Sequence, residues 1–101
     1  MKMIGIIGGM GPASTVIYYD TLCQMARDRF GGNASARVII DALDFGQVQA
    51  LQQSGEWDEA GRQLAASGKR LEQAGAGLIL LATHTMHKVA APLEAALSVP
   101  F

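Results

Sequence analysis

Short apolar runs alternate along the chain with longer segments in which polar and apolar residues are mixed. The apolar runs lie within residues 3–7, 37–41 and 78–82, the second of them bounded by Arg37 and Asp41, and none of them shows a polar residue at every second position. Continuous apolar runs of this length are typical of parallel strands that are covered on both faces. We therefore predict three buried strands, with residues 98–101 forming the approach to another.

The segments between these runs have helical periodicity. In residues 13–30, apolar side chains recur at steps of three and four, which predicts one buried helical face composed of Val16, Tyr19, Leu22 with Cys23, Ala26 and Phe30. A short turn or helix is expected from Asp44–Phe45 to Gln53. A longer helix is expected from near Glu56 to Gly75, with Ser54 as its N-cap.

The last predicted helix covers residues 86–97 and is kinked or divided at Pro92. Strands that alternate with helices, and that are apolar on both faces, predict an α/β fold: a Rossmann-like three-layer domain with a mainly parallel sheet. In such sheets ligands bind beyond the carboxyl ends of the strands. The loops at residues 8–14, 41–45 and 83–87 should therefore converge on one site.

Composition narrows the class of protein. The chain has 101 residues, is 50% hydrophobic and has a formal net charge of -1, which gives no electrostatic basis for binding nucleic acid or an anionic membrane. The single cysteine, Cys23, excludes a disulfide scaffold and a four-thiolate zinc site. The N-terminal apolar run is too short for a signal peptide, and no segment approaches a membrane span of about 20 residues. A cytoplasmic protein of one domain is expected.

The glycine-rich loop at residues 8–12 places backbone N–H groups at the start of a helix, where phosphate or carboxylate would suit it equally. The segment from Gly9 through Gly11 to Ser14, with Asp41 after the second strand, is a partial match to a dinucleotide fingerprint. The third glycine is replaced by serine, and Pro12 crowds the position of the pyrophosphate. Glycines that only permit a sharp turn are the remaining alternative.

The loop after the third strand carries the other candidate chemistry. Thr83 and Thr85 could cap the following helix or act in catalysis. His84 and His87 could bind a metal, but no third ligand has matching spacing, so no metal site is expected. Cys23 lies in the middle of a helix, where a small buried thiol is the ordinary explanation.

Several motifs together resemble the aspartate/glutamate racemase family. They are residues 3–15, Tyr18–Tyr19, Asp44–Phe45, Gly55-Glu-Trp-Asp58 and Ala82-Thr-His-Thr-Met-His-Lys88, in order and with compatible spacing. The resemblance implies a cofactor-independent racemase of two similar α/β domains with the substrate in the cleft between them. Residues 1–101 would form the N-terminal domain, and the second domain is absent from this sequence.

In this family each domain supplies one acid/base residue, normally cysteine, and the pair removes and returns the Cα proton on opposite faces. By resemblance, Thr83 occupies the first catalytic position. His84 stands where the family has an asparagine that helps to hold the substrate carboxylate, and Thr85 can donate to that carboxylate. The other substrate-binding positions carried over are Gly9, Met10, Ser14, Thr15 and Gln52.

Two departures from the family pattern leave alternatives open. A threonine hydroxyl is far less acidic than a thiol, whose reference pKa is about 8.5, and is therefore a poor base without help. His84 could bind carboxylate, assist Thr83 or mark lost activity. The alternatives to a racemase acting on an amino acid or dicarboxylate are a non-catalytic carboxylate-binding module and a nucleotide-binding Rossmann domain. A homo-oligomer or a missing second domain would complete the cleft.

Overall fold

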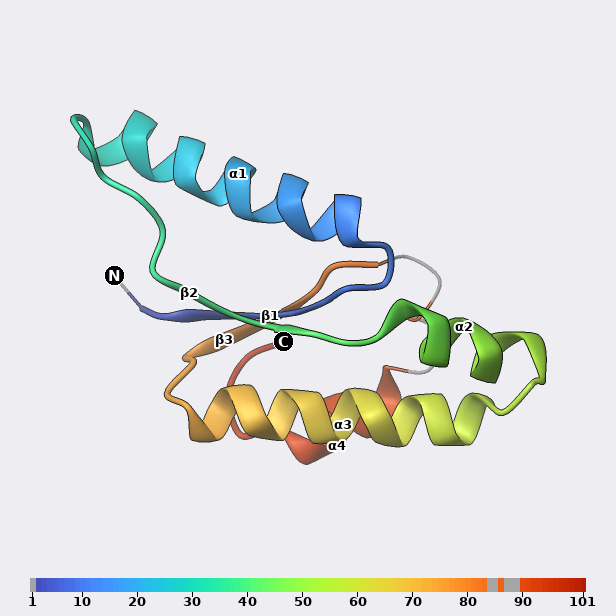
Figure 1. The fold of residues 1–101 in the computed structure, drawn as a ribbon. Coiled ribbons are helices and arrows are strands. Elements are labelled where there is room, and N and C mark those ends of the chain that lie inside the picture. The colour runs from blue at the N-terminus through green and yellow to red at the C-terminus, as the bar shows by residue number, and fades with distance from the viewer. Residues whose placement is uncertain (1, 84–85, 87–89) are drawn as a thin grey trace.

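The computed structural model describes residues 2–83, 86 and 90–101. Strands and helices alternate along this part of the chain (Figure 1), which confirms the predicted α/β class. The elements in order are β1 (Ile4–Gly8), α1 (Pro12–Phe30), β2 (Val38–Ala42), α2 (Phe45–Gln53), α3 (Trp57–Gln73), β3 (Leu78–Leu81) and α4 (Ala91–Ala96). Among the described residues, no helix is both long and apolar enough to cross a membrane.

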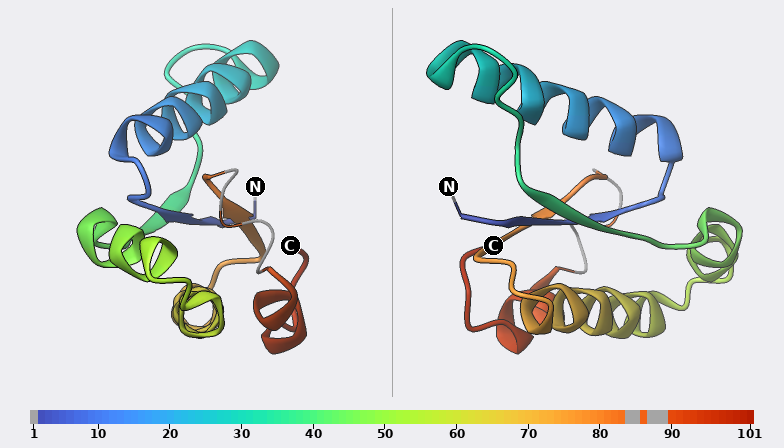
Figure 2. Two further views of the ribbon diagram at one scale, coloured as in Figure 1. Left: turned by 90° about the vertical axis from the view of Figure 1, so that its right-hand side faces the viewer. Right: turned by 60° about the vertical axis from the view of Figure 1, so that its left-hand side comes forward.

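The three strands form a parallel sheet in the order β2-β1-β3. Ile7 of the central strand pairs with Asp41 on one side and with Leu81 on the other, so the three strands end at nearly the same level. Helix α1 lies on one face of the sheet, and α2, α3 and α4 lie on the other (Figure 2). The molecule therefore has the three predicted layers.

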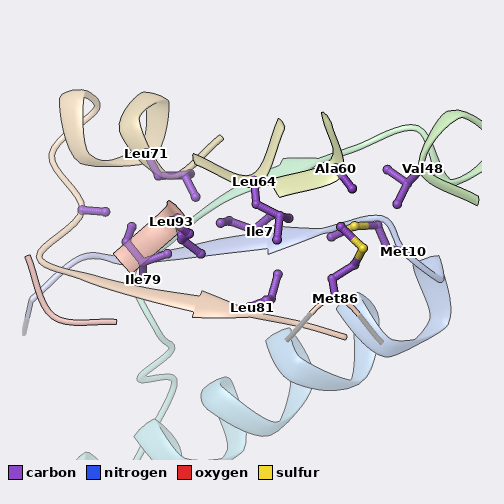
Figure 3. Close-up of a cluster of buried hydrophobic side chains, with 11 residues drawn as sticks. Ile7, Met10, Val48, Ala60, Leu64, Leu71, Ile79, Leu81, Met86 and Leu93 are labelled. Atoms are coloured by element: carbon purple, nitrogen blue, oxygen red, sulfur yellow. The ribbon is translucent and has the colours of Figure 1, made fainter. Parts of the chain in front are cut away.

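The main hydrophobic core lies between the sheet and α3 (Figure 3). Ile7 and Ile79 of the sheet and Leu64 of α3 are completely buried there, together with Leu93 of α4. The continuous apolar runs fold as strands because both faces of the sheet are apolar, and the α3 side of the sheet is the face that this core closes.

Helix α1 buries a narrower strip than its sequence pattern predicts. Cys23 and Ala26 are buried as expected, but Val16, Tyr19 and Phe30 are exposed to 67%, 44% and 60%. The prediction of a single buried face that includes these three residues is therefore wrong. The buried strip of α1 runs through Thr15, Cys23 and Ala26, so Val16 and Tyr19 lie beside it and not on it. Phe30 is the last residue of α1, at the end of the helix that lies farther from the sheet (Figure 1).

The turn between α2 and α3 corrects one predicted cap. Asp44 caps α2 by accepting a hydrogen bond from the Gly46 N–H at 2.9 Å. Ser54, predicted as the N-cap of α3, instead follows the end of α2, and its hydroxyl donates to Glu56 at 2.6 Å. Gly55 has a φ of +75° and reverses the chain there, which moves the start of α3 to Trp57.

The C-terminal residues lie beside the outer edge of β3, the edge that does not pair with β1. The predicted helix over residues 86–97 is described here as α4 from Ala91 to Ala96, with Pro92 in its first turn, and residues 87–89 lie outside the described part. The Ile79 N–H donates to the Pro100 carbonyl at 2.9 Å. Residues 98–101 are not a strand, but they follow the edge at which the sequence predicted one.

Candidate active site

The carboxyl ends of the strands come together through backbone hydrogen bonds. The Leu43 N–H after β2 donates to the Gly8 carbonyl at 2.8 Å, and the Ala82 N–H after β3 donates to the Ile7 carbonyl at 2.9 Å. The first and second loops are therefore joined directly, and the third begins beside them. This is the edge of the sheet at which parallel α/β folds place their ligands.

Gly9 gives the first loop its shape. Its φ is +89°, and a Cβ at this position would overlap the Leu43 carbonyl oxygen. Its N–H donates to the Thr15 hydroxyl oxygen at 2.8 Å. That N–H is thus used within the protein, so an anion at this loop would have to be bound by other groups.

Thr15 and Ser14 lie at the start of α1 in different surroundings. Thr15 is buried, and a Cβ added to Gly8 would lie 2.8 Å from its Cγ2 atom, so the first loop and the helix meet very closely. The Ser14 side chain is exposed, while its N–H donates to the Gly11 carbonyl at 3.1 Å. Of these two predicted substrate ligands, Ser14 has a side chain that a ligand could reach, whereas the Thr15 hydroxyl stabilises the first loop by accepting from the Gly9 N–H.

The Met10 side chain points into the core. It is only 4% exposed and lies in the same buried cluster as Met86, Val48 and Ala60 (Figure 3). The cluster links the first loop to the segment after β3, because Met10 and Met86 come from these two parts of the chain. For a ligand at this edge, Met10 therefore offers its main chain and not its side chain.

Thr83 and Gln52 approach the same edge from β3 and α2. Thr83 is half-buried and lies two residues after the end of β3. Gln52, also half-buried, is in the last turn of α2, and its Nε2 lies 3.1 Å from the Met86 sulfur. The remaining predicted ligands, His84 and Thr85, lie outside the described residues, as does His87.

Asp41 is the residue that would bind the ribose if the domain bound a nucleotide, but its carboxylate already accepts hydrogen bonds from other residues of the protein. Its Oδ2 accepts hydrogen bonds from the Ser67 hydroxyl at 2.6 Å and from the Arg70 guanidinium at 2.7 Å. Both partners belong to α3, so Asp41 ties the edge strand β2 to that helix. Because this carboxylate already has three donor contacts, the arrangement weighs against a dinucleotide site.

Cys23 is placed as the sequence predicts, buried in α1 and away from the site edge. A hydrogen bond between the Tyr19 hydroxyl and the Cys23 thiol, one turn apart, is the main reason that the pKa of Tyr19 lies above its ordinary value. Among the described residues no three His, Cys, Asp or Glu side chains gather as metal ligands, and the pair His84 and His87 is outside that search.

Sequence reasoning missed the part played by Leu43. Its backbone N–H and carbonyl enclose Gly8 and Gly9, so it fixes the first loop without using its side chain. A contact made only by the main chain leaves no trace in residue type. The indirect signal was the pair of adjacent glycines, which indicates close approach by some other backbone.

Comparison with known proteins agrees with this arrangement. The family model described as Asp/Glu/Hydantoin racemase matches residues 7–101. A proposed Asp/Glu racemase from Yersinia pestis has 41% identity and a TM-score of 0.95 over 99% of this chain. An aspartate racemase homologue from Pyrococcus horikoshii has 35% identity and a TM-score of 0.88, also over 99%. This chain covers only 44% and 43% of those two chains. The chain belongs to the Asp/Glu/hydantoin racemase family.

Proposed function

We propose that this chain supplies one half of the active site of an amino-acid racemase that acts on aspartate, glutamate or a similar α-amino acid. The site would be completed by a second α/β domain across a cleft at the carboxyl edge of the sheet. No cofactor takes part: one group removes the Cα proton, and a group on the opposite face returns a proton to the resulting carbanion.

The observation that carries this proposal is the position of Thr83. It follows β3 at the edge where the glycine loop after β1 and the end of α2 also meet. The family match and the two solved structures support the reaction class. In this scheme Thr83 is the acid/base group on this side, and Ser14 and Gln52 contribute to holding the substrate.

The hydroxyl of Thr83 makes this half of the site weak as a base. A thiol with a reference pKa of about 8.5 forms some thiolate at neutral pH, whereas an aliphatic hydroxyl stays protonated. Thr83 is therefore better suited to return a proton than to remove one. The proposed enzyme would favour substrates of one hand, with the stronger base in the other domain.

The test is exchange of the Cα proton of L- and D-aspartate and glutamate in deuterium oxide, followed by proton NMR. The protein would be the chain alone and the chain joined to the part of the Yersinia pestis protein outside the matched region. We expect exchange in the joined protein, loss of at least about tenfold in Thr83→Ala and a gain in Thr83→Cys.

Cys23→Ala is the matched control, because Cys23 is the single cysteine of the sequence and its thiol is buried in α1. It should leave exchange unchanged. Equal exchange in Thr83→Ala and the parent protein would remove Thr83 from the reaction. Exchange that falls with Cys23→Ala but not with Thr83→Ala would contradict the assignment of the site.

A second candidate, a carboxylate-binding module without catalysis, is favoured by one observation: the strand-end position carries Thr83 in place of a thiol. This candidate predicts that aspartate raises the midpoint of thermal unfolding while no Cα exchange occurs in any variant, including Thr83→Cys. Exchange in the parent protein would exclude it.

A further inference from the structure

The side chain of Gln52 connects the end of α2 to the segment that follows β3. Its Nε2 donates to the Met86 sulfur at 3.1 Å, although the two residues are 34 positions apart in the sequence. Gln52 is half-buried in the last turn of α2, and Met86 follows Thr83 by three residues. The contact therefore joins a predicted substrate ligand to the segment that carries the proposed acid/base group.

The core holds Met86 in place on its side of this contact. The Met86 side chain is 1% exposed and lies in the buried cluster that also contains Met10, Val48 and Ala60 (Figure 3). Val48 lies about one helical turn before Gln52 in α2, so the same cluster anchors the helix that carries Gln52. The Gln52 amide thus meets a sulfur atom whose position is set by packing.

The chemistry of the two partners suits a contact that orients the amide without competing for it. A primary amide has two N–H donors and one carbonyl acceptor, whereas a thioether sulfur is only a weak acceptor. The bond to sulfur uses one N–H and leaves the second for another partner. A hydrogen bond to an ionised carboxylate is about twice as strong as one between neutral groups, so a carboxylate at this edge would be the preferred partner of the Gln52 amide.

We propose that Met86 is a positioning residue for substrate binding: its sulfur holds one N–H of Gln52, so that the other N–H is directed to a carboxylate of the substrate. The inference rests on the proposed function, because it takes Gln52 as a substrate ligand. Leucine in place of Met86 would fill a similar volume but would accept no hydrogen bond. The Gln52 side chain would then have to be ordered when the substrate binds, at a cost in conformational entropy.

This role predicts a particular division between the kinetic constants. Because the cost of ordering Gln52 falls on the binding step, loss of the sulfur should raise KM. A change that instead displaced Thr83 would act on proton transfer and would lower kcat. The two constants therefore separate the positioning of Gln52 from a general disturbance of the segment after β3.

The test uses the chain joined to the part of the Yersinia pestis protein outside the matched region, with aspartate as the substrate for Cα exchange. We expect Met86→Leu to raise KM at least about fivefold and to change kcat by less than about twofold. Gln52→Ala should raise KM at least as much, and adding Met86→Leu to it should raise KM no further, since the sulfur acts through the amide. Leu64→Met, the reverse exchange at a fully buried position of the same cluster, is the matched control and should change neither constant.

A lower kcat with an unchanged KM in Met86→Leu would overturn the proposal, as would effects of the two variants that multiply in the double variant. A second measurement leaves Met86 in place, in case leucine disturbs folding there. With carbon-13 in the methionine methyl groups, the NMR signal of Met86 should move in Gln52→Ala, while that of Met25, which is 60% exposed, should not. An unmoved Met86 signal would show that the contact is absent and would also overturn the proposal.

Binding of aspartate separates failure of this inference from failure of the proposed function. If the parent protein shows no Cα exchange, the proposed racemase fails, and the dissociation constant of aspartate then takes the place of KM. Affinity at least about fivefold lower in Met86→Leu than in the parent protein would still support the positioning role, and equal affinity would overturn it. A parent protein that does not bind aspartate would overturn both.

Discussion

The two faces of the sheet are built from similar residues but are covered to different extents. On the α3 face, Ile7 and Ile79 are fully buried beneath Leu64 and Leu71. On the α1 face, Ile6 of the central strand is also fully buried, but its partner Ile40 on the edge strand β2 is 40% exposed, although it belongs to the same apolar run as Ile39, which packs against the core. The difference teaches that an apolar run predicts that a face will be covered, but not which element covers it.

The polar contacts follow the same division. The α3 face is tied down by the contacts of Asp41 with Ser67 and Arg70, and by those of Glu72 with Ser98. On the α1 side, the corresponding described tie is the hydrogen bond from the Gly9 N–H to Thr15. The α3 side of the domain is therefore fixed along its length, while α1 is held most firmly at its first turn.

The largest expected effect comes from removing matched leucines on the two faces. Leu64→Ala would leave a cavity in a fully closed core, and we expect a loss of about 3–5 kcal/mol in the free energy of unfolding. Leu22→Ala removes the same atoms from a half-buried position at an apolar pocket beside α1, which Ile4 and Met25 also line, so we expect about 1 kcal/mol. Urea unfolding of the two variants measures the difference. Equal losses would show that the α1 side is packed as tightly as the α3 side.

Substitutions that add atoms should also destabilise the protein more on the α3 side of the sheet than on the α1 side. A Cβ on Gly5 would lie 3.0 Å from the Ala76 Cβ and 3.1 Å from the Leu71 Cβ, neither of which can rotate away. We expect Gly5→Ala to cost about 1–3 kcal/mol through overpacking. Ala36→Val adds atoms at the same pocket beside α1 and should change stability by less than about 0.5 kcal/mol. Thermal unfolding of both variants measures the difference. A Gly5→Ala protein as stable as the parent would contradict the close packing of Gly5 against Ala76 and Leu71.

The same contrast explains what the sequence could and could not predict. The strands and the order of elements follow from local patterns, since apolar runs and helical periodicity are properties of neighbouring residues. The exposure of Val16 and Phe30 does not follow, because it depends on which side of α1 faces the sheet and on how closely each end of the helix approaches it. The N-cap at Ser54 failed because Gly55 redirects the chain, which is a matter of backbone conformation.

The candidate site was likewise predictable only in part. The predicted parallel sheet placed Thr83 and the glycine loop at one edge, beyond the carboxyl ends of the strands, and the structure has them there. It did not predict that the Met10 side chain is buried or that the Thr15 hydroxyl is engaged by Gly9. Both facts depend on which way a side chain turns after the chain has folded, and residue type alone does not contain that information.

The tie at the first turn of α1 gives a smaller expected effect. Thr15→Val keeps the shape of the side chain but removes the acceptor of the buried Gly9 N–H. An unsatisfied buried donor costs roughly 1–2 kcal/mol, and we expect a loss of that size in the free energy of unfolding. Thr15→Ser keeps the acceptor and is the control. If the two variants are equally stable, the hydrogen bond contributes nothing and α1 is held by packing alone.

The smallest expected effect is a dependence on pH that belongs to the α3 side. Hydrogen bonds from the Ser98 hydroxyl and N–H hold the pKa of Glu72 below its ordinary value of 4.5. Because the folded state favours the carboxylate, this stabilisation is present above pH 4.5 and is lost as the pH falls through and below that value. Urea unfolding between pH 6 and pH 3 should therefore show a smaller loss of stability on acidification in Glu72→Gln than in the parent protein.

The matched control is Glu94→Gln, which changes an exposed glutamate on α4 and should lose as much stability on acidification as the parent protein does. An identical pH dependence in Glu72→Gln and the parent would mean that the contact with Ser98 does not distinguish the folded from the unfolded chain. The α3 side would then owe its rigidity to apolar packing, and its difference from the α1 side would be one of burial only.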